Sequence, residues 1–234
     1  MSTSSTPTDQ AAITPATAYR PLRNGLTAVG IGYTASWIVG LSVWPSNLSV
    51  TSTKAQILAA FSAHQAMATI QYLLTEGLPA FGIAIVSLAL GRMMRRTGAL
   101  RRARVVSTVG VLAAAVSLVQ TVLGVILTES AVPAGDLNRA GLLFEAVNRL
   151  DGVKMFLLAA LALSAHALFR RGALPIWLGR TGLVLAVAIT ASGVGYLLLN
   201  PTMALFAWVS LPLLLVWITG SAVALGRASA RTGR

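Results

Sequence analysis

The chain has 234 residues, of which 56% are hydrophobic and only 10% are charged. A soluble domain usually carries roughly 25% charged residues, so this composition excludes an ordinary water-soluble protein. The net charge of +12 would suit a nucleic-acid-binding protein, but the arginines flank apolar runs and form no basic domain, so no nucleic-acid partner is expected. The absence of cysteine excludes disulfides and thiolate metal sites.

Six apolar segments are long enough to cross a bilayer, whose hydrocarbon core of about 30 Å needs about 20 residues of helix. They predict an all-α polytopic membrane protein with six transmembrane helices in residues 20–226. Residues 1–19 are rich in Ser, Thr, Ala and Pro and are predicted to be a disordered tail, and residues 227–234 a short C-terminal tail. The predicted spans are Gly25–Trp44, Ala66–Gly91, Val105–Leu127, Leu150–Phe169, Thr181–Leu199 and Met203–Leu225.

The basic residues divide unequally between the two sides of such a bundle. With six spans, all but four of the 18 Lys and Arg residues fall on the side that holds both termini. Positive residues in short loops stay in the cytoplasm, so both termini are predicted to be cytoplasmic. The four basic residues on the outer side are Lys54, Arg139, Arg149 and Lys154.

Two stretches outside the spans have amphipathic helical patterns. Residues Thr51–Gln65 begin with Ser and Thr, which are good helix caps, and residues Asp136–Arg149 begin with an Asp cap. Within the second stretch, Glu145 and Arg149 have the i,i+4 spacing of an ion pair. Both stretches are predicted to be short outer-surface helices that lie on, or extend, the second and fourth spans.

Charged side chains at membrane depth need a partner or a function, because burying a charge in lipid is costly. Glu76 lies near the middle of the second span, Gln120 lies at similar depth in the third, and Lys154 and Asp151 lie further out in the fourth. We expect these residues, with Tyr72, to converge on an outward-facing polar pocket. The alternative is structural: a neutral glutamic acid that joins helices by hydrogen bonds, and a lysine that extends to the headgroups.

An arginine-rich segment joins the second and third spans, and its first role is to set the orientation of the chain. Four of its residues, Arg95, Arg96, Arg101 and Arg102, are also candidates for contact with the headgroups of anionic lipids. The lipid bilayer itself is the one partner that the composition implies directly.

The two histidines give no sign of a metal or cofactor site. His64 belongs to the first amphipathic stretch, whereas His166 lies near the inner end of the fourth span. Because they fall on opposite sides of the membrane, they are not expected to share a metal. No other pattern in the sequence indicates a cofactor, and no catalytic residues are assigned.

Three motifs in the second half of the chain carry a family resemblance. They are Asp151-Gly-Val-Lys-Met-Phe-Leu-Leu, Arg170-Arg-Gly-Ala-Leu-Pro-Ile-Trp-Leu-Gly and Ala191-Ser-Gly-Val-Gly-Tyr-Leu. With them, most of residues 20–226 resembles an uncharacterised family of six-span bacterial membrane proteins of the actinobacterial type. The resemblance implies six helices in a bacterial cytoplasmic membrane, and it implies no activity and no functional residues.

These observations favour a small transporter or ligand-binding membrane protein that uses the polar pocket. The alternative is an accessory or scaffold subunit that binds another membrane protein, or a second copy of itself, through small residues such as Gly193 and Gly195. An intramembrane lipid-modifying enzyme fits less well, because no acid, base and nucleophile converge.

Overall fold

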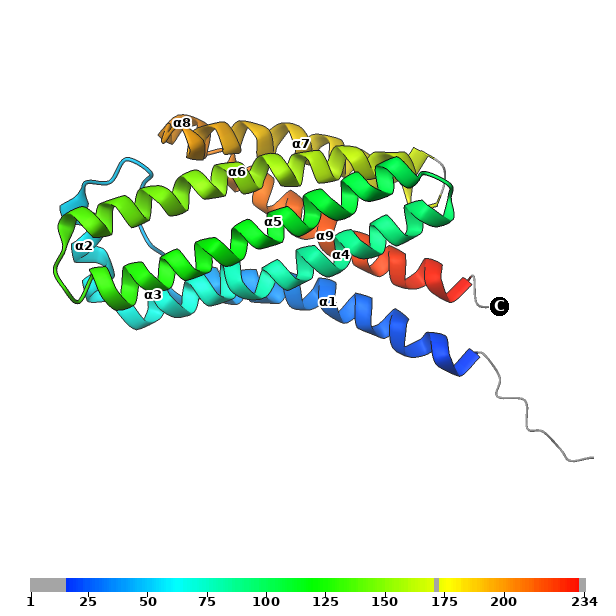
Figure 1. Ribbon diagram of the computed structural model, residues 1–234, viewed down its shortest axis with the longest axis horizontal. Coiled ribbons are helices and arrows are strands. Elements are labelled where there is room, and N and C mark those ends of the chain that lie inside the picture. Colours follow the sequence, from blue (N-terminus) through cyan, green and yellow to red (C-terminus); the bar gives the residue numbers. More distant parts are fainter. Residues whose placement is uncertain (1–15, 171–172, 232–234) are drawn as a thin grey trace, which may run out of the picture.

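The computed structural model describes residues 16–170 and 173–231, and within these residues the chain is helical with no strand. The helices run roughly parallel to the long axis of an elongated bundle (Figure 1). They are α1 (Ala16–Val43), α2 (Lys54–Ala63), α3 (Gln65–Tyr72), α4 (Leu78–Arg96), α5 (Leu100–Ile126), α6 (Leu137–Arg170), α7 (Ile176–Leu197), α8 (Pro201–Ala204) and α9 (Ala207–Arg231), with two π-helical turns, η1 (Leu73–Gly77) and η2 (Leu127–Ala131).

Six helical stretches are long and apolar enough to cross a membrane, which confirms the predicted fold class. The second stretch is built from α3, η1 and α4 without interruption, the third from α5 and η2, and the sixth from α8 and α9. Large apolar side chains cover the outside of the bundle: Trp208 is 81% exposed and Val187 is 74% exposed. Such a surface requires a lipid environment, since water would not solvate it.

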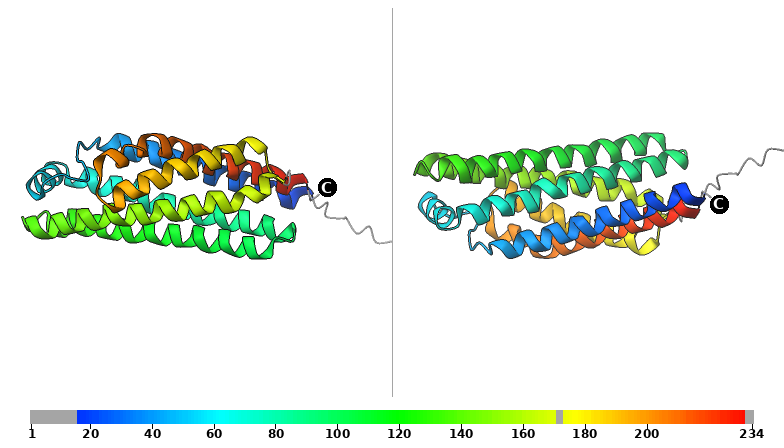
Figure 2. Two further views of the ribbon diagram at one scale, coloured as in Figure 1. Left: turned by 90° about the horizontal axis from the view of Figure 1, so that it is seen from above. Right: turned by 90° about the horizontal axis from the view of Figure 1, so that it is seen from below.

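Helices that follow one another in the chain pack side by side, and α1 packs along α9 to close the bundle (Figure 2). The start of α1, the end of α9, the α4–α5 connection, the end of α6 and the start of α7 lie together at one end (Figure 1). We call this the arginine-rich end, and the opposite end, which carries α2 and α8, the α2 end. The arginines of the arginine-rich end with described side chains are Arg92, Arg95, Arg96, Arg101, Arg102, Arg104, Arg170, Arg180 and Arg227.

The two amphipathic stretches form different structures. The first forms the separate helix α2, which begins with a capping box between Thr53 and Gln56. The second is not separate: it forms the first part of α6, which at 34 residues is about 51 Å long and exceeds the thickness of a bilayer core. Asp136 caps α6 as predicted, because its Oδ1 accepts the backbone N–H of Arg139 at 3.0 Å.

Most of the predicted N-terminal tail, but only the last three residues of the predicted C-terminal tail, lie outside the described residues. Residues 1–15 are not described, whereas residues 16–19 begin α1. At the other end, α9 continues to Arg231, and residues 232–234 are not described.

Two apolar clusters fill the interior, and a polar layer separates them. The larger cluster extends to the arginine-rich end, and the smaller lies at the α2 end. Along α6, Ala140 belongs to the smaller cluster and Leu158 to the larger, and the buried Lys154 and partly buried Asp151 lie between them. The same order of apolar, polar and apolar residues is found along α5 and along the span that contains η1.

Glycines allow the helices of this layer to approach closely. A Cβ added to Gly152 of α6 would lie 2.7 Å from the carbonyl oxygen of Gly193 of α7. A Cβ added to Gly195 would clash with the backbone of Ala204 in α8. Gly193 and Gly195 therefore form contacts within the chain. They are not free to bind a partner protein in the way that the scaffold hypothesis assumed.

We predict that Gly152→Leu lowers the free energy of unfolding by about 1–3 kcal/mol, the usual cost of overpacking. Thermal unfolding in a mild detergent measures the change. The matched control is Gly32→Leu, since Gly32 is exposed and has no atom within 4 Å of its added Cβ. Equal unfolding midpoints for the two variants would contradict the close contact of α6 and α7.

Candidate functional site

Glu76 lies in η1, a turn in which the helix is wider than an α-helix because its backbone hydrogen bonds span five residues in place of four. Pro79 follows this turn and has no N–H, so a carbonyl of the preceding turn loses its backbone donor. The hydroxyl of Ser36 in α1 donates to the carbonyl of Leu74 in this turn. The sequence thus places an irregular turn at Glu76, and α1 satisfies part of its backbone.

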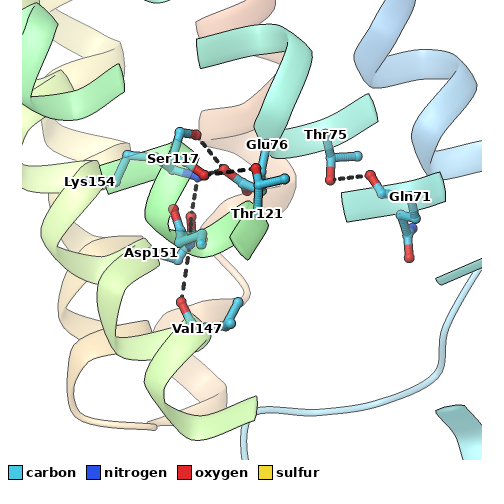
Figure 3. A network of polar contacts seen from close by, with 9 residues as sticks. Gln71, Thr75, Glu76, Ser117, Thr121, Val147, Asp151 and Lys154 are labelled. Atoms are coloured by element: carbon cyan, nitrogen blue, oxygen red, sulfur yellow. Dashed lines mark hydrogen bonds and ion pairs between the residues drawn. The ribbon is translucent and has the colours of Figure 1, made fainter. Parts of the chain in front are cut away.

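Lys154 of α6 is held between two carboxylates (Figure 3). Its Nζ lies 2.6 Å from Oε2 of Glu76 and 2.6 Å from Oδ1 of Asp151. The exposed fractions of the side chains are 6% for Lys154, 10% for Glu76 and 18% for Asp151. With all three groups ionised, the triad carries one negative charge in excess, inside a bundle whose outer surface is apolar.

Polar side chains of α5 complete this network. The hydroxyl of Ser117 donates to Oε2 of Glu76. Nε2 of Gln120 donates to the carbonyl of Val147 at 3.1 Å and to Oδ1 of Asp151 at 3.3 Å. Oε1 of Gln120 is buried and has no hydrogen-bond partner among the described residues. An acceptor is therefore left free beside the ionic triad.

Two tyrosines from other helices lie near the same charges. Tyr33 of α1 and Tyr196 of α7 are both within electrostatic range of Glu76, Asp151 and Lys154. Tyr33 is 3% exposed, and it packs against Gly82 of α4. Helices α1 and α7 thus also contribute side chains near the network.

The structure brings together four of the five residues predicted to share a site: Glu76, Gln120, Asp151 and Lys154. Tyr72 is within electrostatic range of Glu76 but lies outside this cluster. Its ring lies against Gly124 and is stacked on Phe61, with ring centroids 6.4 Å apart, so it belongs to an aromatic cluster at the α2 end. Ser117 was not foreseen, although its position three residues before Gln120 places both on one face of α5.

The predicted outward opening is not part of the site in this conformation. Taken as whole residues, Glu76 is 8% exposed and Lys154 is 5% exposed, so the network is covered. A cavity of about 540 Å³ does lie at the α2 end, and it is separate from the network. It is lined by residues that include Trp44, Asn47, Gln56, His64 and Met67.

A second acidic residue lies in the second π-helical turn, and the sequence analysis did not single it out. Glu129 is exposed in η2, where its Oε1 accepts the hydroxyl of Thr69 at 2.6 Å and its Oε2 accepts Nε2 of Gln65 at 3.2 Å. The two turns have related sequences, Leu-Thr-Glu-Gly-Leu-Pro ending at Pro79 and Leu-Thr-Glu-Ser-Ala-Val-Pro ending at Pro133. The repeated Leu-Thr-Glu before proline was the signal available in the sequence.

The four arginines predicted to meet lipid headgroups are all exposed at the arginine-rich end. Arg95 and Arg96 lie in the last turn of α4. Arg101 and Arg102 lie at the start of α5.

The fold and the site define a polytopic α-helical membrane protein with a buried ionic network. No family model, curated protein or solved structure matches this chain. The resemblance to a six-span bacterial family therefore stays a prediction.

We predict unequal effects for the members of the triad. Lys154→Met leaves two carboxylates without a cation, and removing one partner of a buried ion pair usually costs about 3–5 kcal/mol. Glu76→Gln leaves Lys154 paired with Asp151 and should destabilise the protein much less. The free energy of unfolding, measured by titrating a denaturing detergent into protein held in a mild one, shows which variant is less stable.

The control for this comparison is Glu145→Gln, which breaks the exposed pair of Glu145 and Arg149. Exposed pairs contribute about 1 kcal/mol or less, so this variant should be close to the unmodified protein. A Lys154→Met variant as stable as the control would contradict the geometry of the triad.

Proposed function

We propose that this protein is a small membrane transporter or ligand-binding protein, and that its ligand binds at the network of Glu76, Gln120, Asp151 and Lys154. One observation carries the proposal: two carboxylates share one ammonium in the polar layer between two apolar clusters. Buried ion pairs are weak contributors to stability, because desolvation offsets their attraction. Ionisable side chains inside a membrane are instead typical of ion, proton and substrate sites.

The network has the chemistry to exchange partners. Its excess negative charge can be met by a proton or by a cationic group of a ligand, and the free Oε1 of Gln120 offers a further acceptor. The irregular turn η1, followed by Pro79, allows local change in the helix that carries Glu76. The excess charge, the free acceptor and the irregular turn support a site that opens and closes. None of the three would stabilise a purely structural network.

The route to the site, in this proposal, begins at the cavity at the α2 end. Trp44 lines that cavity and packs edge-on against Phe61, with ring centroids 5.0 Å apart. Phe61 in turn stacks on Tyr72. This aromatic cluster covers the network from the α2 end, so we assign Tyr72 to the cover and not to direct ligand contact.

The same proposal includes the orientation and the membrane. The α2 end faces outward, the arginine-rich end faces the cytoplasm, and the membrane is the cytoplasmic membrane of a bacterium. The distribution of arginine supports this orientation, because positive residues stay in the cytoplasm. At the cytoplasmic surface, the exposed arginines contact anionic lipid headgroups.

The orientation predicts the location of reporters. After Arg234, a fluorescent protein, which is active in the cytoplasm, should be active, and alkaline phosphatase, which is active outside, should not. Near Ala134, the phosphatase should be active and the fluorescent protein should not. Paired fusions of alkaline phosphatase and a fluorescent protein make this measurement. The reverse pattern, or both positions on one side, would overturn the assigned orientation.

Ligand binding predicts an extra mass on the protein released from mild detergent and measured by native mass spectrometry. The Glu76→Gln variant should lose this mass while it stays folded, because it removes one of the two carboxylates. Glu129→Gln is the matched control, since it makes the same change in the other π-helical turn, where Glu129 is exposed.

Two results would count against the proposal. A bare monomer in the unmodified protein gives no support for a bound ligand, and a mass that remains in Glu76→Gln places the ligand elsewhere. Recovery of the chain with a second protein, unaffected by Glu76→Gln, would favour the accessory-subunit alternative.

A further inference from the structure

A groove of about 450 Å³ lies at the arginine-rich end, between the start of α5 and the end of α6. It is far along both helices from the ionic network and is separate from the proposed ligand site. Three arginines, one histidine, one serine and three apolar residues line it. They are Arg101, Arg102, Val105, Leu163, Ser164, His166, Ala167 and Arg170.

The three arginines of this groove have no counter-ion in the part of the chain that the structure describes. Among the described residues, Arg101, Arg102 and Arg170 form no ion pair. The acidic residues of the described chain all lie from the ionic network to the α2 end, so none is near enough to neutralise the groove. They are Glu76, Glu129, Asp136, Glu145 and Asp151. An anion from outside the protein is therefore attracted to these three positive charges.

The inner wall of the groove, on the parts of α5 and α6 further from the arginine-rich end, is apolar and faces the membrane. Val105 is 42% exposed and Leu163 is 52% exposed, on helices whose outer faces contact lipid. Ala167, one turn beyond Leu163 on α6, keeps the groove open because its side chain is small. A free inorganic anion would use only the arginines, whereas a molecule with an anionic head and an acyl chain would use both walls.

We propose that this groove holds a single anionic glycerophospholipid. Its phosphate lies among Arg101, Arg102 and Arg170, and the hydroxyl of Ser164 is a further donor. An acyl chain follows Val105 and Leu163 toward the membrane interior. Basic pockets between transmembrane helices are a known means of binding such headgroups. The inference narrows the general lipid contact described above, because Arg95 and Arg96 do not line the groove, and it is independent of the ligand site at Glu76.

The test is native mass spectrometry of the protein titrated with phosphatidylglycerol, and separately with phosphatidylcholine and with inorganic phosphate. We expect one phosphatidylglycerol to bind first and to remain bound at collision energies that remove phosphatidylcholine. Substituting Gln for Arg101, Arg102 and Arg170 together should weaken this binding roughly 100-fold, at about fivefold for each arginine.

The control removes the same number of charges at the same end, by substituting Gln for Arg92, Arg95 and Arg96 of α4. This control should keep the tightly bound lipid. A second variant, Ala167→Leu, fills the groove and leaves every charge in place, so it should also lose the lipid. Because it does not change the basic residues that set orientation, its loss of lipid is not explained by inverted insertion of the chain.

Three outcomes would overturn the inference. Equal losses in the two triple variants would mean that general attraction to a basic surface explains the binding. Retention of the lipid in Ala167→Leu would exclude the groove. Displacement of the lipid by inorganic phosphate at equal concentration would mean that the arginines bind a free anion and that the apolar wall plays no part.

Discussion

Lys154 is shared by two carboxylates, and the rest of the bundle is arranged around that contact. Glu76 reaches it from the second span, Asp151 lies one turn away on α6, and α5 supplies hydrogen-bond donors from Ser117 and Gln120. Apolar clusters lie on both sides of this polar layer. The layer joins the second, third and fourth spans by ion pairs and hydrogen bonds. Water can replace these interactions only if the bundle opens, so any movement of the site also moves the helices.

The irregular turns place the acidic groups. In η1 the helix is locally widened, Pro79 removes a backbone donor, and Ser36 of α1 satisfies a carbonyl of the turn. In η2 the related sequence places Glu129 at the exposed edge, where Thr69 binds it. The same type of turn therefore holds a glutamate in two different environments. In η1 the glutamate belongs to a buried ionic network, and in η2 it forms a polar contact near the α2 end. The difference lies in the neighbours, since Glu76 is paired with Lys154 of α6, whereas Glu129 accepts hydrogen bonds from Gln65 and Thr69 of α3.

Hydropathy and charge were sufficient to predict the six spans, because the length of an apolar run is a direct measure of its fit to a bilayer. They were also sufficient to identify Glu76, Gln120, Asp151 and Lys154, because polar residues are conspicuous in such runs. They could not assign Tyr72, whose ring turns to Phe61, because depth alone does not give the direction of a side chain. The roles of Gly193 and Gly195 depended on which helices are neighbours, which composition does not contain.

The proposed function requires that a ligand reaches the network around Glu76 from the α2 end. The chain has no cysteine, so a single Ser117→Cys substitution gives one thiol beside Glu76 with no background. The measurement is its reaction with a membrane-impermeant thiol reagent added outside intact cells, with Ser107→Cys, buried nearer the arginine-rich end of α5, as the control. The account predicts that the thiol at position 117 reacts and the one at 107 does not. A thiol at 117 that reacts only after the protein is unfolded would mean that the network is a sealed structural core.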